Sequence, residues 1–236
     1  MSEEIKLQRN YWNRESESFD RIYSGGKSKL SLILDKYFRQ DMFERFAFTL
    51  HHSEPAAGKT FLDVGCGTGL YSVELAKKGA QRVLGIDIAE NMLDRCRQLA
   101  AKEHVEQVCR FAHTDLLELE ASERFNVTIG IGLFDYISDA LPVLRKMREV
   151  STDKVIVSFP RFWTWRAPVR KLRLALRGCP VYFFTRRRIA ALLKEAGFAR
   201  HTVKRVGKLH CVVAYPEAEL KKPLTTENTE RHPDDL

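Results

Sequence analysis

The chain has 236 residues, 44% of them apolar, which is enough to bury one sizeable core with a small appended lid. Its amino terminus, MSEEIKLQRN, lacks an apolar signal core, and no apolar run approaches the length that spans a bilayer, so we expect a cytoplasmic protein. The five cysteines show no C-x-x-C spacing, which argues against a disulfide framework or a zinc site. The net charge of +8 indicates an anionic partner: a substrate, a nucleic acid or a membrane surface.

The amino-terminal region, residues 1–54, is predicted to form a helical cap ahead of the first strand. Gly25 and Gly26 should interrupt its helices. We expect its aromatic residues to fold back over the mouth of a ligand pocket, and these residues are Tyr11, Trp12, Phe19 and Tyr23.

Strand and helix patterns alternate from residue 55 to residue 215, which we predict to be one domain. Strands are predicted near 60–64, 82–87, 107–112, 125–131 and 153–159, and helices near 69–79, 89–102 and 139–150. This alternation is typical of a parallel sheet covered by helices.

A basic and aromatic insertion follows the fifth strand, over residues 160–184. Its arginines at offsets of 0, 4, 7 and 11 form one helical stripe, Arg166, Arg170, Arg173 and Arg177, and Trp163 and Trp165 lie at the entrance of that helix. One interpretation is a solvated basic helix face. Another is a substrate lid that binds an anionic, partly apolar molecule or makes a peripheral contact with an anionic membrane. A nucleic-acid groove is the third interpretation, ranked below the lid because no separate RNA-binding module is evident.

The carboxyl-terminal part begins with a helix, TRRRIAALLKEAGF, for which Thr185 is the predicted N-cap and Gly197 the stop. Two strands, 199–206 and 208–214, flank Gly207 and are predicted to form an antiparallel hairpin. Residues 216–236 are polar and lack apolar periodicity, so we expect a disordered tail.

The stretch FLDVGCGTGLYS, residues 61–72, joins the first strand to a helix through a glycine turn. Gly65, Gly67 and Gly69 let the backbone approach a ligand and adopt positive φ. The spacing G-x-G-x-G differs from the dinucleotide fingerprint G-x-G-x-x-G, because Leu70 occupies the position of its third glycine. Asp63 would repel a pyrophosphate, whereas S-adenosylmethionine (SAM) presents an ammonium and a sulfonium that a carboxylate attracts. The turn therefore favours SAM over NAD.

Two further acids stand at successive strand ends. Asp87 follows Gly65 by 22 residues and ends the second strand, which suits an acid that binds both ribose hydroxyls. Asp115 lies just past the third strand, where the adenine of a bound nucleoside would lie. Together with Asp63, these acids indicate a pocket for a cationic nucleoside.

These segments resemble the class I SAM-dependent methyltransferases. LDVGCGTG is similar to their first motif, GIDIAENML to their ribose motif, HTDLLEL to their adenine-side motif and RFNVTIGIGLFDYIS to their fourth-strand motif. The resemblance covers roughly residues 55 to 215. Within the superfamily, SFDRIYSGG and the pairing of VIVSFP with TRRRIAALLKEAGF are most similar to the magnesium-protoporphyrin and ubiquinone-type O-methyltransferases.

The resemblance implies a Rossmann-like, doubly wound α/β fold with a seven-stranded sheet and an antiparallel last strand. It also implies a set of SAM-binding residues, namely Tyr23, Asp63, Gly65, Cys66, Gly67, Gly69, Asp87, Ile88, Met92, Asp115, Leu116 and Gly130. Cys66 is interpreted as a small filler within the turn rather than as a nucleophile.

The segment GIGLFDYISD follows the fourth strand and passes nearest the methyl group in this family, so Asp135 and Tyr136 are the candidate catalytic residues. Tyr136 stands where many relatives carry histidine. An unperturbed tyrosine, with a pKa of about 10, is a poor base at neutral pH, so we expect Tyr136 to orient a substrate. Asp135 has an alternative interpretation as a helix N-cap or a solvent-facing acid. His113 and His210 are expected to be ordinary packed or solvated histidines, and Asn126 to be structural.

The function predicted from these features is SAM-dependent methyl transfer to a small molecule, at oxygen of a hydroxyl or carboxyl group on an anionic or amphiphilic acceptor. An RNA methyltransferase and a non-catalytic SAM-binding partner subunit are the alternatives. The sequence lacks the N/D-P-P-Y/F motif of amino-group DNA methyltransferases. Its only Cys-Pro pair, Cys179-Pro180, has the order opposite to that of the cytosine-C5 enzymes. We expect no metal centre, because no cluster of metal ligands appears.

Overall fold

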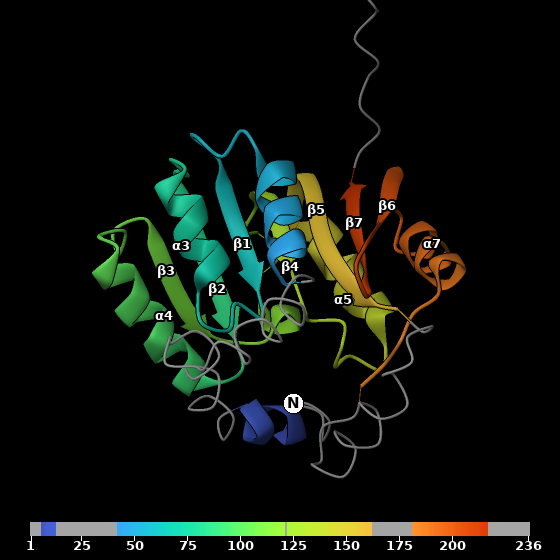
Figure 1. Cartoon of the computed structure of the whole chain (residues 1–236), viewed down its shortest axis with the longest axis horizontal. Helices are drawn as coiled ribbons and strands as arrows, with labels where there is room; N and C mark the ends of the chain where they lie inside the picture. Colours follow the sequence, from blue (N-terminus) through green and yellow to red (C-terminus); the bar gives the residue numbers. More distant parts are fainter. Residues whose placement is uncertain (1–5, 13–41, 121, 162–180, 217–236) are drawn as a thin grey trace, which may run out of the picture.

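The computed structural model describes residues 6–12, 42–120, 122–161 and 181–216 and is built around a single sheet (Figure 1). The strands are β1 (Thr60–Val64), β2 (Arg82–Asp87), β3 (Cys109–His113), β4 (Phe125–Gly130), β5 (Ser151–Pro160), β6 (Arg200–Val206) and β7 (Leu209–Tyr215). The helices are α3 (Leu70–Lys77), α4 (Glu90–Lys102), the 3-10 helix η1 (Leu116–Glu118), α5 (Ala140–Val150) and α7 (Arg186–Glu195). Residues 6–12 and 42–53 are also helical.

The seven strands lie in the order β3-β2-β1-β4-β5-β7-β6. β1 to β5 are parallel, whereas β7 runs antiparallel to both of its neighbours, β5 and β6. This topology confirms the predicted doubly wound α/β sheet with an antiparallel last strand.

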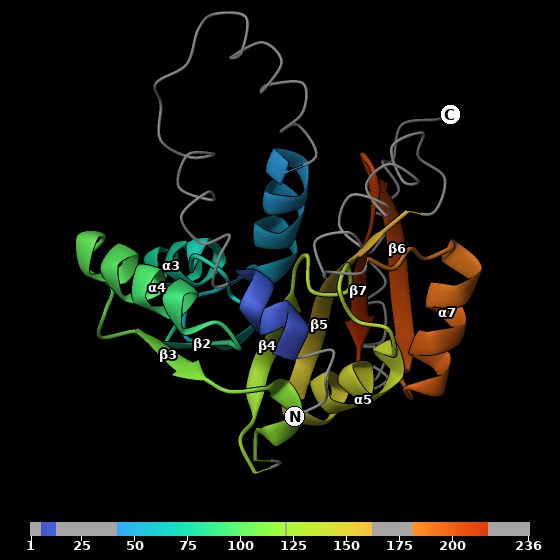
Figure 2. The same ribbon diagram turned by 90° about the horizontal axis from the view of Figure 1, so that it is seen from below.

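Apolar side chains alternate between the two faces of the sheet, because successive strand residues point to opposite sides. Phe61 packs in the core on one face, under α3, α4 and the helical segment 42–53. Leu62 packs in the core on the other face, with α5, α7 and η1. Figure 2 shows the resulting three layers.

The predicted ends of the last helix are confirmed. Thr185 caps α7, since its hydroxyl accepts a hydrogen bond from the Arg188 amide at 3.2 Å. Gly197 follows the helix at φ +85°, in the left-handed region that favours glycine.

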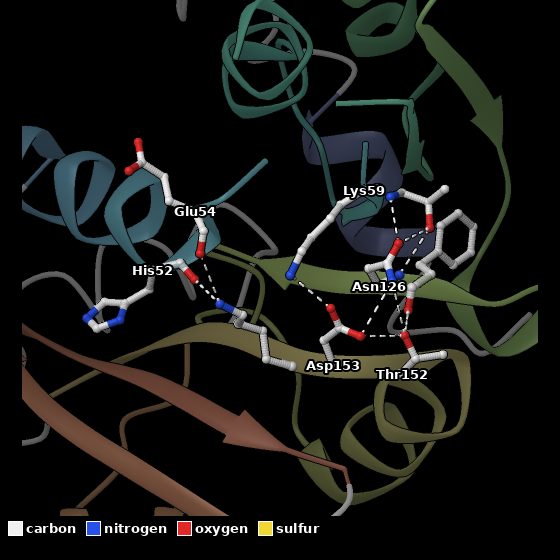
Figure 3. A network of polar contacts seen from close by, with 9 residues as sticks. His52, Glu54, Lys59, Asn126, Thr152 and Asp153 are labelled. Atoms are coloured by element: carbon white, nitrogen blue, oxygen red, sulfur yellow. Dashed lines mark hydrogen bonds and ion pairs between the residues drawn. The ribbon is translucent and has the colours of Figure 1, made fainter. Parts of the chain in front are cut away.

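The amino ends of the strands are joined by a polar network (Figure 3). The Asn126 side-chain oxygen accepts hydrogen bonds from the Thr60 amide at 2.9 Å and from the Thr60 hydroxyl at 3.1 Å. The Asn126 side-chain nitrogen, Nδ2, lies 3.4 Å from Asp153 Oδ1, and Lys59 Nζ lies 3.0 Å from Asp153 Oδ2. These contacts tie β1, β4 and β5 together, the structural role expected for Asn126.

The same network holds the end of the helical segment 42–53 against the sheet. Lys154 Nζ donates to the His52 carbonyl oxygen at 2.8 Å and lies 3.5 Å from the Glu54 carbonyl oxygen, as Figure 3 shows. Because Lys154 belongs to β5, the link fixes where the chain enters β1 relative to the centre of the sheet.

The helical segment 6–12 lies at the opposite edge, where the parallel strands end (Figure 1). Gln8 donates a hydrogen bond to the Tyr136 carbonyl oxygen, and Tyr11 is buried against Val181. Within the described ranges, no helix combines the length and the apolar character needed to cross a bilayer. Several predicted features lie outside those ranges: Phe19, Tyr23, the tail from residue 217, and the lid residues Trp163, Trp165, Arg166, Arg170, Arg173 and Arg177.

Candidate functional site

The glycine turn after β1 has the backbone conformation that its sequence predicts. Gly65, Gly67 and Gly69 have φ values of +67°, +56° and +78°, all in the left-handed region. The amides of Gly65 and Cys66 donate to the Ile86 carbonyl oxygen at 2.9 and 3.1 Å, so β2 holds the start of the turn. The chain then enters α3 directly after Gly69.

The glycines of the turn meet different surroundings. A Cβ atom on Gly69 would lie 3.1 Å from Cβ and Sγ of Cys96, so this glycine allows α4 to pack closely. A Cβ atom on Gly67 would have no heavy atom within 4 Å, so the backbone there opens onto free space. A ligand can therefore approach the main chain at Gly67, which is what binding of a nucleoside at this turn requires.

Cys66 is a packed residue of this turn. Its side chain is 6% exposed, and its Sγ atom lies 3.8 Å from Sγ of Cys96. The Cys96 thiol donates to the Gly67 carbonyl oxygen at 3.0 Å. Contact with Cys96 and burial raise the pKa of the Cys66 thiol well above its ordinary value, which opposes thiolate formation. These contacts fit the interpretation of Cys66 as a filler.

Asp87 joins the end of β2 to the glycine turn. Its Oδ2 atom accepts from the Gly67 amide and its Oδ1 atom from the Ala89 amide, both at 2.9 Å. Each carboxylate oxygen keeps acceptor capacity after one such bond, so both can still accept from a diol. Burial raises the pKa of Asp87, and the bonds from the backbone amides only partly offset this effect.

Asp63 lies beneath the turn and is 2% exposed. Its carboxylate accepts a hydrogen bond from the Ser72 hydroxyl of α3 at 2.7 Å. Burial raises the pKa of Asp63 to about 7, and the nearby charge of Asp87 adds to the rise. Because the charged form of this pair of carboxyl groups is disfavoured, a cation bound at the turn would relieve the cost of ionising them.

Asp115 and Leu116 lie where the chain leaves β3. The Asp115 side chain accepts from the Leu117 amide at 2.9 Å and thereby caps η1, while Leu116 is buried. A capping role therefore accounts for the local position of Asp115, and its predicted contact with adenine stays a prediction.

The remaining predicted cofactor residues lie near neighbouring strand ends. Ile88 follows β2, and its carbonyl oxygen is 3.0 Å from Nε2 of the exposed His113. Met92 is buried on the first turn of α4. Gly130 ends β4, where a Cβ atom would lie 2.8 Å from Cε of Met147, so only glycine fits there without a shift of that side chain.

Asp135 is buried, at 5% exposed, so its interpretation as a solvent-facing acid is wrong. It is also not the cap of the following helix, because Asp139 caps α5 by accepting from the Leu141 amide at 3.2 Å. The Asp135 carbonyl oxygen accepts from the Tyr182 amide at 2.9 Å, so the segment after β4 is tied to the chain that returns from the 162–180 region.

Tyr136 packs against the helical segment 6–12. Its ring meets that of Trp12 edge to face, with centroids 5.2 Å apart, and Trp12 in turn contacts Tyr11 at 5.3 Å. The structure thus brings the two candidate catalytic residues and the first amino-terminal helix to one edge of the sheet, beside the end of β4.

Arg45, on the helical segment 42–53, is a further candidate residue of this site. Its Nε atom is buried and has no hydrogen-bond partner among the residues that the structure describes, and its Nη1 atom would lie 3.3 Å from a Cβ atom on Gly132. Leu133 links this point to the glycine turn, since its Cδ1 atom would lie 3.1 Å from a Cβ atom on Gly65. No local motif marks Arg45, because the contact forms only when distant segments pack together.

Comparison with known proteins gives a consistent picture. A family model described as a methyltransferase domain matches residues 55–197. The chain is 34% identical over 139 residues to demethylmenaquinone methyltransferase of Oceanobacillus iheyensis, covering 56% of this chain and 55% of the relative. It is 32% identical over 114 residues to a ubiquinone biosynthesis O-methyltransferase of Ruegeria pomeroyi, covering 48% and 45%. The match thus spans about half the length of these curated relatives.

The fold is also similar to a solved structure. Magnesium protoporphyrin IX methyltransferase from Synechocystis, solved with bound SAH, superposes with a TM-score of 0.70 at 24% sequence identity. The superposition covers 90% of this chain and 99% of the other. At this identity, the likeness establishes the fold.

Proposed function

The chain belongs to the class I SAM-dependent methyltransferases, and on that premise we propose that it transfers a methyl group to oxygen of a small anionic or amphiphilic acceptor. The names of the relatives, which refer to quinone-type and porphyrin acceptors, support a small-molecule acceptor. The alternatives are methylation of RNA and a non-catalytic role as a SAM-binding subunit.

The observation that carries the cofactor assignment is the pair of carboxyl groups under an open glycine turn, one buried (Asp63) and one partly buried (Asp87). Asp63 and Asp87 both have raised pKa values, and Gly67 faces free space. A cationic nucleoside suits this arrangement because it brings positive charge to the two acids and no phosphate. In the proposed complex Asp87 accepts from the ribose hydroxyls, and Asp115 and Leu116 lie beside the adenine. When bound, SAM supplies an electrophilic methyl carbon.

Arg45 is proposed to bind the carboxylate of the methionine moiety. Its buried Nε atom lacks a hydrogen-bond partner within the described part of the chain, and a guanidinium is the side chain that best pairs with a carboxylate. Its position beside Gly132 puts it next to the segment that follows β4 and, through Leu133, near Gly65. Arginine there would orient the cofactor so that its methyl group faces the acceptor.

The acceptor is proposed to bind over the segment that contains Asp135 and Tyr136. The rate of an in-line displacement at carbon is raised mainly by holding the acceptor oxygen and the methyl carbon together. Few protein residues therefore need to take part chemically. Tyr136 would orient the acceptor, and a carboxylate acceptor needs no general base at neutral pH.

The helical segment 6–12 covers the segment with Asp135 and Tyr136 through Gln8 and Trp12, which supports a site shielded from water. The arginine stripe of the 160–184 insertion is proposed to face the acceptor.

One experiment separates the three functions. The protein is incubated with SAM carrying a labelled methyl group and with separate metabolite, lipid and RNA extracts. We expect label in the metabolite or lipid extract, and transfer reduced about tenfold or more by an Asp87→Ala control at a SAM concentration below saturation. Tyr136→Phe should keep most of the transfer, because the proposed role of Tyr136 is to orient rather than to remove a proton. Label only in RNA would contradict the proposal, and label in no extract would favour the partner-subunit role.

A further inference from the structure

A group of basic residues lies at the carboxyl edge of the sheet, separated from the glycine turn by β4 and β5. Arg161 directly follows β5, Arg205 lies near the end of β6, and His210 near the start of β7. Arg186 is the first residue of α7. We call these four residues the basic corner.

The strand register brings the basic corner onto one face. His210 is paired directly with Phe159 of β5 and with Arg205 of β6, and directly paired residues point to the same side of a sheet. Phe159 belongs to the core that α5 and α7 cover, so His210 and Arg205 lie on the face of α7.

Hydrogen bonds fix Arg161 beside this pair. Its backbone amide donates to the Lys208 carbonyl oxygen at 3.1 Å, and its Nη1 atom donates to the Gly207 carbonyl oxygen at 3.0 Å. Both acceptors belong to the turn between β6 and β7. The guanidinium of Arg161 is therefore held at the tip of the hairpin that carries Arg205 and His210.

The electrostatics of the corner are unfavourable without an anion. Burial lowers the pKa of His210, and Arg161, Arg186 and Arg205 lower it further. Burial and Arg205 also lower the pKa of Arg161. Protonation of His210 would put a second positive charge directly opposite Arg205, which destabilises a sheet, and cations at the start of a helix oppose its dipole. The first turn of α7 nevertheless consists of Arg186, Arg187 and Arg188.

We propose that the basic corner, Arg161, Arg186, Arg205 and His210, is a subsite that binds an oxyanion, a carboxylate or phosphate, carried by the methyl acceptor. An oxyanion would offset the repulsion among the three arginines, would favour the protonated form of His210, and would accept charge-assisted hydrogen bonds from these groups. The assignment to an acceptor rests on the function proposed above.

The position of the corner also sets the length of the acceptor. Neighbouring strands are about 4.8 Å apart, and the corner extends from β5 across β7 to β6. The segment with Asp135 and Tyr136 follows β4, next to β5. On this spacing, the anionic group of the acceptor would lie about 5–15 Å across the sheet from that segment, so we expect its charge to be remote from the reacting atom.

The test uses inorganic phosphate as the probe and His210 as the reporter. The His210 imidazole signal is identified by NMR from its absence in His210→Gln, and phosphate is added at constant ionic strength. We expect a saturable shift of that signal and a rise of the His210 pKa. In the double variant Arg161→Gln/Arg205→Gln the phosphate affinity should fall about tenfold or more. The matched double variant Arg145→Gln/Arg200→Gln, on α5 and at the start of β6, should bind phosphate as the unmodified protein does.

Three results would overturn the inference: no saturable shift, an equal shift in the Arg161→Gln/Arg205→Gln variant, or an equal loss in the matched control. A second arm uses phosphatidylcholine vesicles with and without phosphatidylglycerol. Vesicle binding that needs Arg161 and Arg205, in a protein that does not bind free phosphate, would assign the corner to a lipid surface instead.

SAM affinity and transfer of label are measured on the same variants. Label transfer by a protein that binds no phosphate would refute this inference and leave the proposed function in place. Phosphate binding without label transfer into any extract would refute the proposed function and, with it, the assignment of the oxyanion to a methyl acceptor.

Discussion

The two edges of the parallel sheet use the same kinds of residues in opposite ways. At the amino edge, Asn126, Thr60, Asp153 and Lys59 bond to one another, and each polar group offsets the cost of burying its neighbour (Figure 3). At the carboxyl edge, two carboxyl groups lie close enough for the charge of Asp87 to raise the pKa of Asp63.

This difference distinguishes a structural polar cluster from a binding site within the same fold. A carboxylate of the amino edge has its counter-charge within the protein, whereas the pair at the carboxyl edge lacks full compensation and gains it when a cation binds. The following predictions test that distinction.

The largest expected effect is an opposite pH dependence of stability at the two edges. The folded-state pKa of Asp63, about 7, lies above its unfolded value, so its contribution is full below about pH 4 and is lost as pH rises through 7. The loss is on the order of 4 kcal/mol. Between pH 5 and pH 8, urea unfolding should show the unmodified protein losing more stability than Asp63→Asn, whose amide can still accept from Ser72.

Asp153 provides the contrast. Burial alone would raise the pKa of Asp153, but the bonds from Lys59, Thr152 and Asn126 outweigh burial and lower it. Its contribution is therefore present above about pH 4 and is lost as pH falls through the lower folded-state pKa. Asp153→Asn should change the stability curve on the acid side only. A constant difference between Asp63→Asn and the unmodified protein at all pH values would contradict the comparison.

The next effect concerns cofactor affinity. Asp87→Ala should weaken SAM binding by about tenfold or more, since it removes charge-assisted hydrogen bonds worth roughly 1.5–3 kcal/mol. Calorimetry with SAM measures this directly. Asp153→Ala removes a carboxylate at the other edge and should leave the SAM affinity unchanged, so an equal loss in both variants would show that the affinity depends on general stability and not on the site.

A smaller effect is expected from the centre of the amino-edge network. Asn126→Ala leaves the partly buried Thr60 amide without its acceptor, and the free energy of unfolding should fall by about 1–2 kcal/mol. SAM affinity should not change. The idea that this edge is purely structural would fail if the variant bound SAM more weakly at a temperature where it is fully folded.

The smallest effect is expected for Lys59→Ala. The ion pair with Asp153 has side chains 24% and 34% exposed, so solvent screens it and its contribution should be below about 1 kcal/mol. Chemical unfolding at low and high salt measures it, and the difference between variant and unmodified protein should shrink as salt is added. A larger, salt-independent loss would show that Lys59 also supports the network by packing.

Much of the fold follows from the sequence, because periodicity and turn residues are local signals. Thr185 and Gly197 mark the ends of α7 correctly. The third strand begins later than predicted, at Cys109, because the amides of Val108 and Cys109 both bond to the Val105 carbonyl oxygen and form a turn there. Such a turn carries no distinctive residue.

Less of the candidate site could be predicted. The motif gives the position of Asp63, but its burial against Ser72 depends on how α3 packs on the strand. Asp135 and Asp139 both lie near the start of the helix predicted at 139–150, and only the path of the chain shows that Asp139 is the cap. Arg45 reaches Gly132 from a helix far away in sequence. Side-chain direction and distant contacts are set by tertiary packing, so they leave no local pattern.

The buried thiols of the protein can report local opening of the structure. Cys66, Cys96, Cys109 and Cys211 are free and buried, so an alkylating reagent reaches them only when the surrounding structure opens. Cys96 bonds to the carbonyl oxygen of Gly67, so its modification requires α4 to separate from the glycine turn. When each opening is quickly reversed, the rate of alkylation at Cys96 measures the fraction of molecules in which α4 has separated from the glycine turn. No label has to be introduced.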